Sequence, residues 1–362
     1  MENKVCNSDI ITEMKKSNYW ILLTIIAVAV SVRLLGLDLS LLPSEQKASV
    51  ILSISLGTLS VIGLYFLVKE MFDEKLAAIA SFFLAVSSWH VLLSDIGTED
   101  ILVSFALIFA FYFIWHGLKY GRTFNFFLAG LFGGVGFYTG RSYLFAPIVV
   151  LLLFWNYWDY IKKDFSLSKY EEVKKEILGG FSLLVITVIV TVLPLMWYIW
   201  QNPGFIFSTV NSIFSTTEPV VQFYKNIGWM TDRLLLMEFG GENLISWPLS
   251  IFFIIGFIKE LIHWLKRKHG HFSATHTLIF SWLFVMAVPA LLASMSSIIL
   301  FAAVLPPILI LSAKGLWWVI EKLNRWNHEI YPRPHKHWVG LDAGPLLAVL
   351  ALMVSIALLE IF

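Results

Sequence analysis

The stretch Trp89-His90-Val91-Leu92-Leu93-Ser94-Asp95-Ile96-Gly97-Thr98-Glu99-Asp100 lies where one long apolar segment of the chain ends and the next begins. It holds three carboxylates and no lysine or arginine. An ionised carboxylate inside lipid is costly, so an acid at the end of a membrane span either lies in headgroup water or serves a site. This turn is therefore the first candidate for a functional site.

The composition around that turn predicts an all-α polytopic membrane protein. Of the 362 residues, 58% are hydrophobic and only 14% are charged, whereas a soluble domain has about 25% charged residues. A net charge of +1 argues against nucleic acid as a partner, because nucleic-acid binding requires a basic face. We therefore expect the partners to be carried by the membrane. A single cysteine, Cys6, excludes an internal disulfide.

The hydropathy pattern predicts about eleven transmembrane helices, since each crossing needs about 20 apolar residues. The predicted spans are 18–36, 47–68, 76–94, 100–118, 125–140, 144–161, 177–200, 245–265, 275–294, 297–320 and 342–362. The predicted organisation is a cytoplasmic tail at 1–17, a transmembrane domain at 18–320, a cytoplasmic loop at 321–341 and a C-terminal span. The semi-apolar outer segment 201–243 is expected to lie along the membrane interface as an amphipathic helix.

The lysines and arginines predict the orientation. With the N-terminus placed inside, 21 of the 26 fall in inner segments, and the rest are Arg33, Lys47, Arg141, Lys225 and Arg233. The positive-inside rule therefore predicts a multi-pass protein of the cell (plasma) membrane with a cytoplasmic N-terminus and Phe362 outside. The turn from Asp95 to Asp100 then faces outward.

The predicted span 125–140 is rich in glycine, at Gly130, Gly133, Gly134, Gly136 and Gly140. Small residues let the backbones of membrane helices approach closely. This pattern therefore indicates tight packing against a neighbouring helix.

Five segments, in this order and spacing, resemble one group of membrane glycosyltransferases. They are Gly57 to Phe72, Ala78 to His90, Ser94 to Asp100, Gly136 to Ser142, and Pro306 to Trp317. Together they resemble the GT-C superfamily, and within it the protein mannosyltransferase and aminoarabinose transferase (glycosyltransferase family 39-like) group. The resemblance covers roughly residues 18–320. It implies a GT-C-like fold and an enzyme that moves a sugar from a polyprenyl-phosphate donor to a lipid, glycan or protein acceptor on the outer face.

The chain departs from that group in its first outer loop. The group has a long loop with an aspartate-glutamate pair that serves as catalytic base. Here only about a dozen residues separate Leu35 from Lys47, and they offer Pro43-Ser44-Glu45. The resemblance therefore leaves a second hypothesis open, a non-catalytic relative that acts as a binding or scaffold subunit. A third is a transporter of lipid-linked sugars, which would show charges at mid-membrane.

Asp100, Glu45 and Asp95 are the candidate catalytic residues. Sugar transfer needs a base for the acceptor hydroxyl and positive charge or a metal for the leaving phosphate. Asp100 matches the aspartate that the family keeps at the start of this span. It is also the candidate ligand if a divalent cation is the cofactor. The alternative is a structural role, in which Asp100 stabilises the start of a helix because the helix dipole favours an acidic residue there.

Further candidates surround these acids. Arg141 is the candidate for gripping the donor phosphate, since a guanidinium pairs with phosphate in a bidentate way; alternatively it reaches headgroups. Glu99, His90 and Glu242 are weaker candidates. Glu99 favours a helix N-terminus, Glu242 follows Gly240-Gly241 at the foot of a span, and His90 lies beside Trp89 at what reads as a membrane interface.

Overall fold

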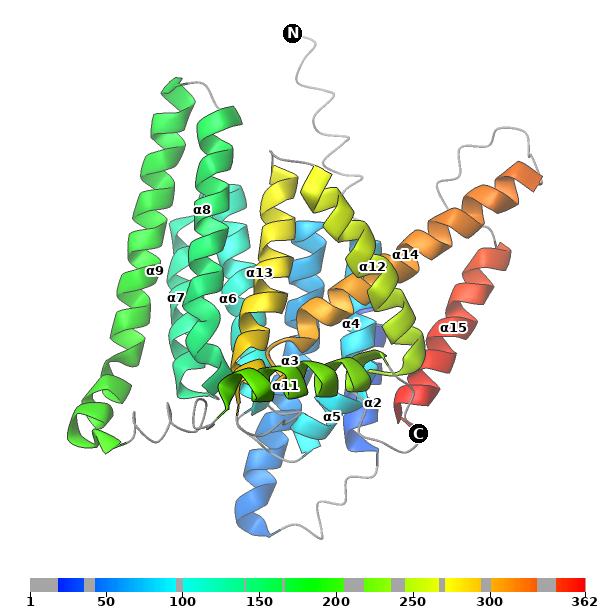
Figure 1. Cartoon of the computed structure of the whole chain (residues 1–362), viewed down its shortest axis with the longest axis horizontal. Helices are drawn as coiled ribbons and strands as arrows, with labels where there is room; N and C mark the ends of the chain where they lie inside the picture. Colours follow the sequence, from blue (N-terminus) through cyan, green and yellow to red (C-terminus); the bar gives the residue numbers. More distant parts are fainter. Residues whose placement is uncertain are drawn as a thin grey trace.

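The fold is an assembly of α-helices, most of which run along one common axis (Figure 1). A computed structural model describes residues 19–35, 43–95, 100–139, 141–164, 167–204, 218–235, 245–266, 271–293, 301–330 and 343–361. Within those ranges there is no strand. The helices are α2 (Tyr19–Leu34), α3 (Ser44–Met71), α4 (Glu74–Val86), α5 (Ser88–Asp95), α6 (Asp100–Tyr120), α7 (Thr123–Val135), α8 (Ala146–Asp164), α9 (Leu167–Gln201), α11 (Pro219–Leu235), α12 (Trp247–Lys266), α13 (His271–Leu292), α14 (Leu305–Ile330) and α15 (Ala343–Ile361).

Short turns join consecutive helices and make neighbours antiparallel. Between α3 and α4 the chain turns at Phe72 and Asp73, and the Asp73 carboxylate caps α4 by accepting from the Leu76 amide at 2.8 Å. Between α6 and α7 it turns at Gly121, which has a φ of 67°, a conformation that glycine adopts without steric cost. Two 3₁₀ turns, η1 (Gly136–Tyr138) and η2 (Arg141–Phe145), connect α7 to α8.

Each predicted span coincides with a helix, but the count of eleven spans is not confirmed. Six of the described helices are long and apolar enough to cross a membrane, and a bent pair, α4 with α5, makes a seventh. Two others are too short, since α2 has 16 residues and α7 has 13, fewer than the roughly 17 needed to span. The predicted span 297–320 falls largely on α14, which has 26 residues but is not among the helices apolar enough to cross. The predicted span 76–94 is broken at Ser87, where the axis bends by 57°.

Glycines set the closest helix crossings. A Cβ added to Gly130 of α7 would lie 2.7 Å from the Leu184 carbonyl oxygen of α9, and one added to Gly134 would lie 2.5 Å from the Thr191 Cβ. The predicted packing role of the glycine-rich segment is thus confirmed. At a second crossing, a Cβ on Gly256 of α12 would overlap the Leu311 carbonyl oxygen of α14.

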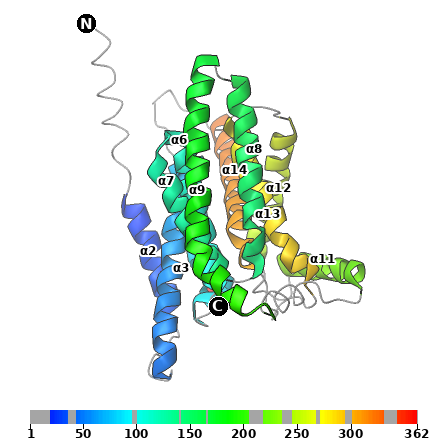
Figure 2. The same ribbon diagram turned by 90° about the vertical axis from the view of Figure 1, so that its left-hand side faces the viewer.

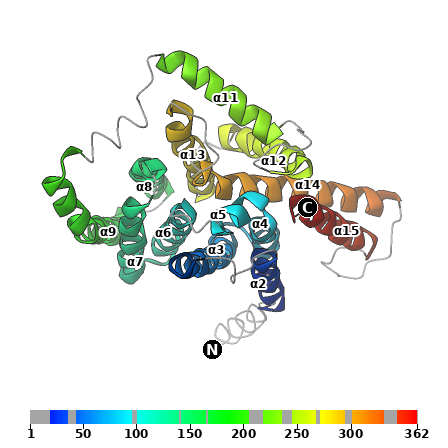
Figure 3. The same ribbon diagram turned by 90° about the horizontal axis from the view of Figure 1, so that it is seen from below.

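One helix, α11, lies across the ends of the others (Figures 1 and 2). It falls within the outer segment expected to be an interfacial helix. Its Asn226 side chain is fully buried and donates to the carbonyl oxygens of Leu291 (3.0 Å) and Ala293 (2.9 Å), at the C-terminal end of α13. The side chains of Val220 and Tyr224 remain exposed. Seen along the axis, α11 runs along the rim of the bundle beside α12 and α13 (Figure 3).

Candidate functional site

The acidic turn joins two helix ends at one end of the bundle. Asp95 is the last residue of α5 and Asp100 is the first residue of α6. Figure 1 shows that α5 ends on the side of the bundle where α11 lies and where α3 begins. The side chains of Asp95 and Asp100 lie outside the described part of the structure, as does the whole of Glu99.

The remaining sequence candidates are placed only through their backbone, or not at all. Glu45 is in the first turn of α3, which begins well beyond the level at which α5 ends (Figures 1 and 2). Arg141 opens η2, which contacts α8 and α13. Glu242 lies outside the described residues. The structure therefore brings Asp95 and Asp100 to adjacent helix ends and places the start of α3 further out.

His90 is an internal residue of the bundle. Both Trp89 (2% exposed) and His90 (0% exposed) are buried within the protein, so neither side chain faces the surroundings of the bundle. The bend at Ser87 turns α5 so that these side chains point into the protein. The guanidinium of Arg33 in α2, also fully buried, approaches His90 Nδ1 to 2.6 Å. Because arginine can only donate, the neutral ring accepts at Nδ1 and carries its proton on Nε2.

Arg33 ties three helices together beside the acidic turn. It donates to the carbonyl oxygens of Ala29 (2.9 Å) and Ala85 (3.3 Å), and to Ser94 Oγ (3.3 Å). Ser94 directly precedes Asp95. The Gly57 backbone of α3 packs against the same group, because an added Cβ would overlap Ser94 Oγ and lie 2.9 Å from Arg33 Nε. Gly57 opens the first segment of the family resemblance, and its lack of a side chain is what admits this contact.

Glu360 in the C-terminal helix holds the other end of α5, and the sequence analysis did not find it. Its carboxylate is 6% exposed. It accepts from the Ser88 amide and hydroxyl, both at 3.0 Å, and from the Ser246 amide at 2.6 Å. Ser88 begins α5, and Ser246 precedes α12. A carboxylate at a helix N-terminus satisfies amide groups that have no partner within the helix and interacts favourably with the helix dipole.

A buried ionic triad links α12, α13 and α14. Glu260 Oε2 lies 2.9 Å from Lys314 Nζ and 2.6 Å from His276 Nε2, and Lys314 Nζ also lies over the Phe72 ring. The sequence signal was a charge inside each of two apolar segments, which marks a site by default. The prediction of orientation counted Lys314 and Arg33 as loop charges, although both lie within helices and are buried.

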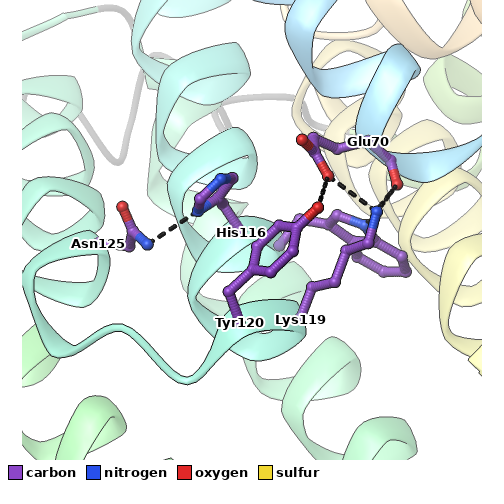
Figure 4. A network of polar contacts seen from close by, with 6 residues as sticks. Glu70, His116, Lys119, Tyr120 and Asn125 are labelled. Carbon is purple, nitrogen blue, oxygen red and sulfur yellow. Dashed lines mark hydrogen bonds and ion pairs between the residues drawn. The ribbon is translucent and has the colours of Figure 1, made fainter. Parts of the chain in front are cut away.

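A polar cluster ties α3 to α6 at the opposite end of the bundle (Figure 4). The Glu70 carboxylate accepts from Lys119 Nζ at 2.8 Å and from the Tyr120 hydroxyl at 3.0 Å. In the same view, Asn125 contacts His116 Nδ1 at 2.9 Å across the turn from α6 to α7. These contacts satisfy polar groups where the helices leave the apolar region, and we assign them a structural role.

The comparisons with known proteins identify the fold. Residues 30–167, somewhat more than a third of the chain, match the profile of the dolichyl-phosphate-mannose-protein mannosyltransferase family. Among solved structures, the chain is similar to the archaeal oligosaccharyltransferase AglB from Archaeoglobus fulgidus in complex with an inhibitory peptide and a dolichol-phosphate, with 16% identity and a TM-score of 0.51. The chain thus has the fold of these membrane glycosyltransferase structures, and its first part is similar to the mannosyltransferase family.

A second structure, the Archaeoglobus fulgidus oligosaccharyltransferase in the apo form, gives 17% identity and a TM-score of 0.50. Each alignment covers 86% of this chain but only 44% of the oligosaccharyltransferase, so the chain spans less than half the length of these structural relatives. At such low identity the likeness shows the fold alone. A search of curated proteins finds no match.

An apolar groove of about 210 Å³ opens into the side of the helical bundle. Its walls come from α6, α7, α8 and α9, and its lining includes Phe111, Tyr143, Leu151, Phe181 and Ile189. Leu151 of α8 and Ile189 of α9 are exposed at its edge, so the groove opens between these two helices. Phe137 of η1 and Tyr143 of η2 line the end of the groove beside the turn that contains Arg141.

The described residues offer no ready-made metal centre. No three histidine, cysteine, aspartate or glutamate side chains gather within the described part of the chain. The side chains of Asp95 and Asp100 lie outside that part, so the expected divalent cation stays a prediction attached to Asp100.

Proposed function

We propose that this chain is a membrane glycosyltransferase that moves a sugar from a polyprenyl-phosphate donor to an acceptor at the end of the bundle where α5 meets α6. The observation that carries the proposal is the support of the acidic turn. Arg33 holds α5 near Asp95, Glu360 holds the start of α5, and Gly57 lets α3 pack against both Arg33 and Ser94.

The apolar groove supports a lipid-linked donor. Three of its four walls, α6, α8 and α9, are helices long and apolar enough to cross a membrane, and it opens sideways between α8 and α9. A hydrocarbon chain can enter it from the lipid without crossing water. The end of the groove beside η1 and η2 would bring the phosphate of such a lipid close to Arg141, whose guanidinium matches phosphate geometry.

The proposed chemistry assigns one role to each residue. Asp100 takes the proton of the acceptor hydroxyl, or holds a divalent cation if one is used, and Asp95 supports it. Arg141 offsets the negative charge on the leaving phosphate. With the predicted orientation, the reaction occurs on the outer face of the membrane, which is also the side expected for α11.

The test is transfer from a panel of polyprenyl-phosphate sugars in proteoliposomes, with and without chelator. Asp100→Asn keeps the size of the side chain and removes its charge, so kcat should fall about 100-fold or more. Asp95→Asn and Glu99→Gln should lower kcat by a smaller factor. Arg141→Lys should raise the donor KM, because an ammonium cannot make the bidentate contact of a guanidinium with phosphate.

The short first outer loop supports a competing hypothesis, a non-catalytic subunit, which predicts a different result in the same assay. The chain has Ser44-Glu45 where the related group carries an acidic pair in a longer loop. If the folded wild type binds donors but turns over none, and Asp100→Asn changes nothing, the chain is a non-catalytic binding subunit with a GT-C fold. Net donor movement across the vesicle without transfer would instead identify a transporter.

A further inference from the structure

The C-terminal helix contributes a buried carboxylate that joins two distant parts of the chain. Glu360 lies on α15, which packs against α4 and α14. One of its oxygens accepts from Ser88 and the other accepts from the Ser246 amide at 2.6 Å. The start of α5 and the start of α12 are thus held by a single side chain, 272 and 114 residues away in sequence.

The place where Glu360 acts is a break in a membrane span. Helices α4 and α5 form a pair bent by 57° at Ser87, and Ser88 is the first residue after the bend. A break exposes amide groups that have no partner within the helix. Glu360 satisfies the amide of Ser88 and its hydroxyl together, so α5 keeps one direction relative to α4 and α12.

The two-turn helix α5 is consequently held from both termini of the chain. Arg33 of the first described helix contacts His90 and Ser94, the third and seventh residues of α5, while Glu360 of α15 caps its start. A helix of eight residues is not stable by itself, because isolated helices shorter than about 12 residues are only marginally stable even in favourable sequences. Its position must therefore come from these contacts and from packing.

We propose that Glu360 is a positioning residue for the acidic turn, through α5. This inference rests on the proposed function, since it concerns the turn from Asp95 to Asp100. A carboxylate is required there because both of its oxygens must accept from N–H or O–H donors at once. In Glu360→Gln one oxygen becomes an amide that can only donate, so either Ser88 or Ser246 loses its acceptor.

The experiment compares Glu360→Gln with Glu360→Asp and with the matched control Ser355→Ala in the full chain. Ser355 lies on the same helix, and its exposed hydroxyl bonds only to the Ala351 carbonyl oxygen of that helix. We expect Glu360→Gln to lower kcat by about 10-fold or more at a donor KM within about two-fold, because small misplacements of reacting groups have such effects. Glu360→Asp should recover part of the loss, and Ser355→Ala should match wild type.

Hydrogen–deuterium exchange over residues 88–95 gives a readout that does not depend on activity. Faster exchange there in Glu360→Gln, with α13 unchanged, supports the anchor even if the wild type proves inactive and the proposed function fails. Unchanged exchange at 88–95 overturns the inference, and so does an unchanged kcat in an active protein. If Glu360→Gln does not fold, Ser88→Ala removes one of the three hydrogen bonds and should shift kcat and exchange in the same direction by a smaller factor.

Discussion

Replacing Gly57 with alanine tests the contact between the family segment in α3 and the support of the acidic turn. The added Cβ would overlap Ser94 Oγ and lie 2.9 Å from Arg33 Nε, whereas ordinary van der Waals contact is about 3.5 Å or more. Neither neighbour is free to give way. Ser94 Oγ donates to the His90 carbonyl oxygen at 2.9 Å, and Arg33 also donates to Ala29 and Ala85.

The expected cost follows from these contacts. Overpacking a buried site costs about 1–3 kcal/mol, and losing the hydrogen bond from Arg33 to Ser94 adds about 1.5 kcal/mol, as for other charged donors. Gly57→Ala should therefore destabilise the protein by about 3 kcal/mol, which lowers Tm by roughly 5 °C or more. Because the strain falls on the residue before Asp95, kcat for sugar transfer should fall further than stability alone explains, by about 10-fold or more.

A double mutant isolates the contact. Ser94→Ala removes Oγ and leaves its Cβ at 3.5 Å from the new methyl group, an ordinary contact. Gly57→Ala combined with Ser94→Ala should thus be less damaged than the sum of the two single variants, a coupling that a double-mutant cycle measures. Gly179→Ala is the control, since a Cβ there meets nothing within 4 Å. Wild-type Tm and kcat in Gly57→Ala would refute the reasoning.

Three further outcomes are expected. Gly256→Ala should lower Tm more than Gly179→Ala, because its Cβ would overlap the Leu311 carbonyl oxygen and backbone cannot move aside; equal Tm values would contradict the crossing of α12 and α14. Lys314→Met should cost about 3 kcal/mol by leaving Glu260 without its ammonium partner, and adding Glu260→Gln should recover part of it, as urea denaturation in detergent can measure; no recovery would count against the pair. Reporter fusions after Lys175, Lys268 and Phe362 should read inside, inside and outside, and an inside signal at Phe362 would remove one predicted span.

Features that depend on local pattern could be predicted from the sequence. Each predicted span overlaps helical structure, because a segment of about 20 apolar residues in lipid must form its backbone hydrogen bonds within a helix. The glycines of α7 predicted a close neighbour, since only the lack of side chains makes that approach possible. The segment around α11 was expected to be an amphipathic helix, and the structure has a helix there.

Features that depend on contacts between distant residues could not be predicted. Hydropathy does not reveal the bend at Ser87, because the two halves together read as one apolar segment long enough to cross a membrane. The partners of Glu360 are more than 100 residues away, and Glu260 and Lys314 are 54 residues apart. The contact between His90 and Arg33 could not be predicted for the same reason, because the two residues are 57 positions apart and lie on different helices.

The buried charges around α5 bear on whether the chain is an enzyme or a non-catalytic relative. A buried ionic group contributes little net stability, and well-packed apolar replacements are often neutral or stabilising. Packing alone therefore does not account for a guanidinium and a carboxylate that are both almost fully buried and that both act on one eight-residue helix. What such groups provide is a defined position, since each accepts or donates several hydrogen bonds of fixed direction. A binding scaffold needs a stable bundle, whereas sugar transfer needs its acidic turn held in one place, and the arrangement of Arg33, Glu360 and Gly57 meets the second requirement.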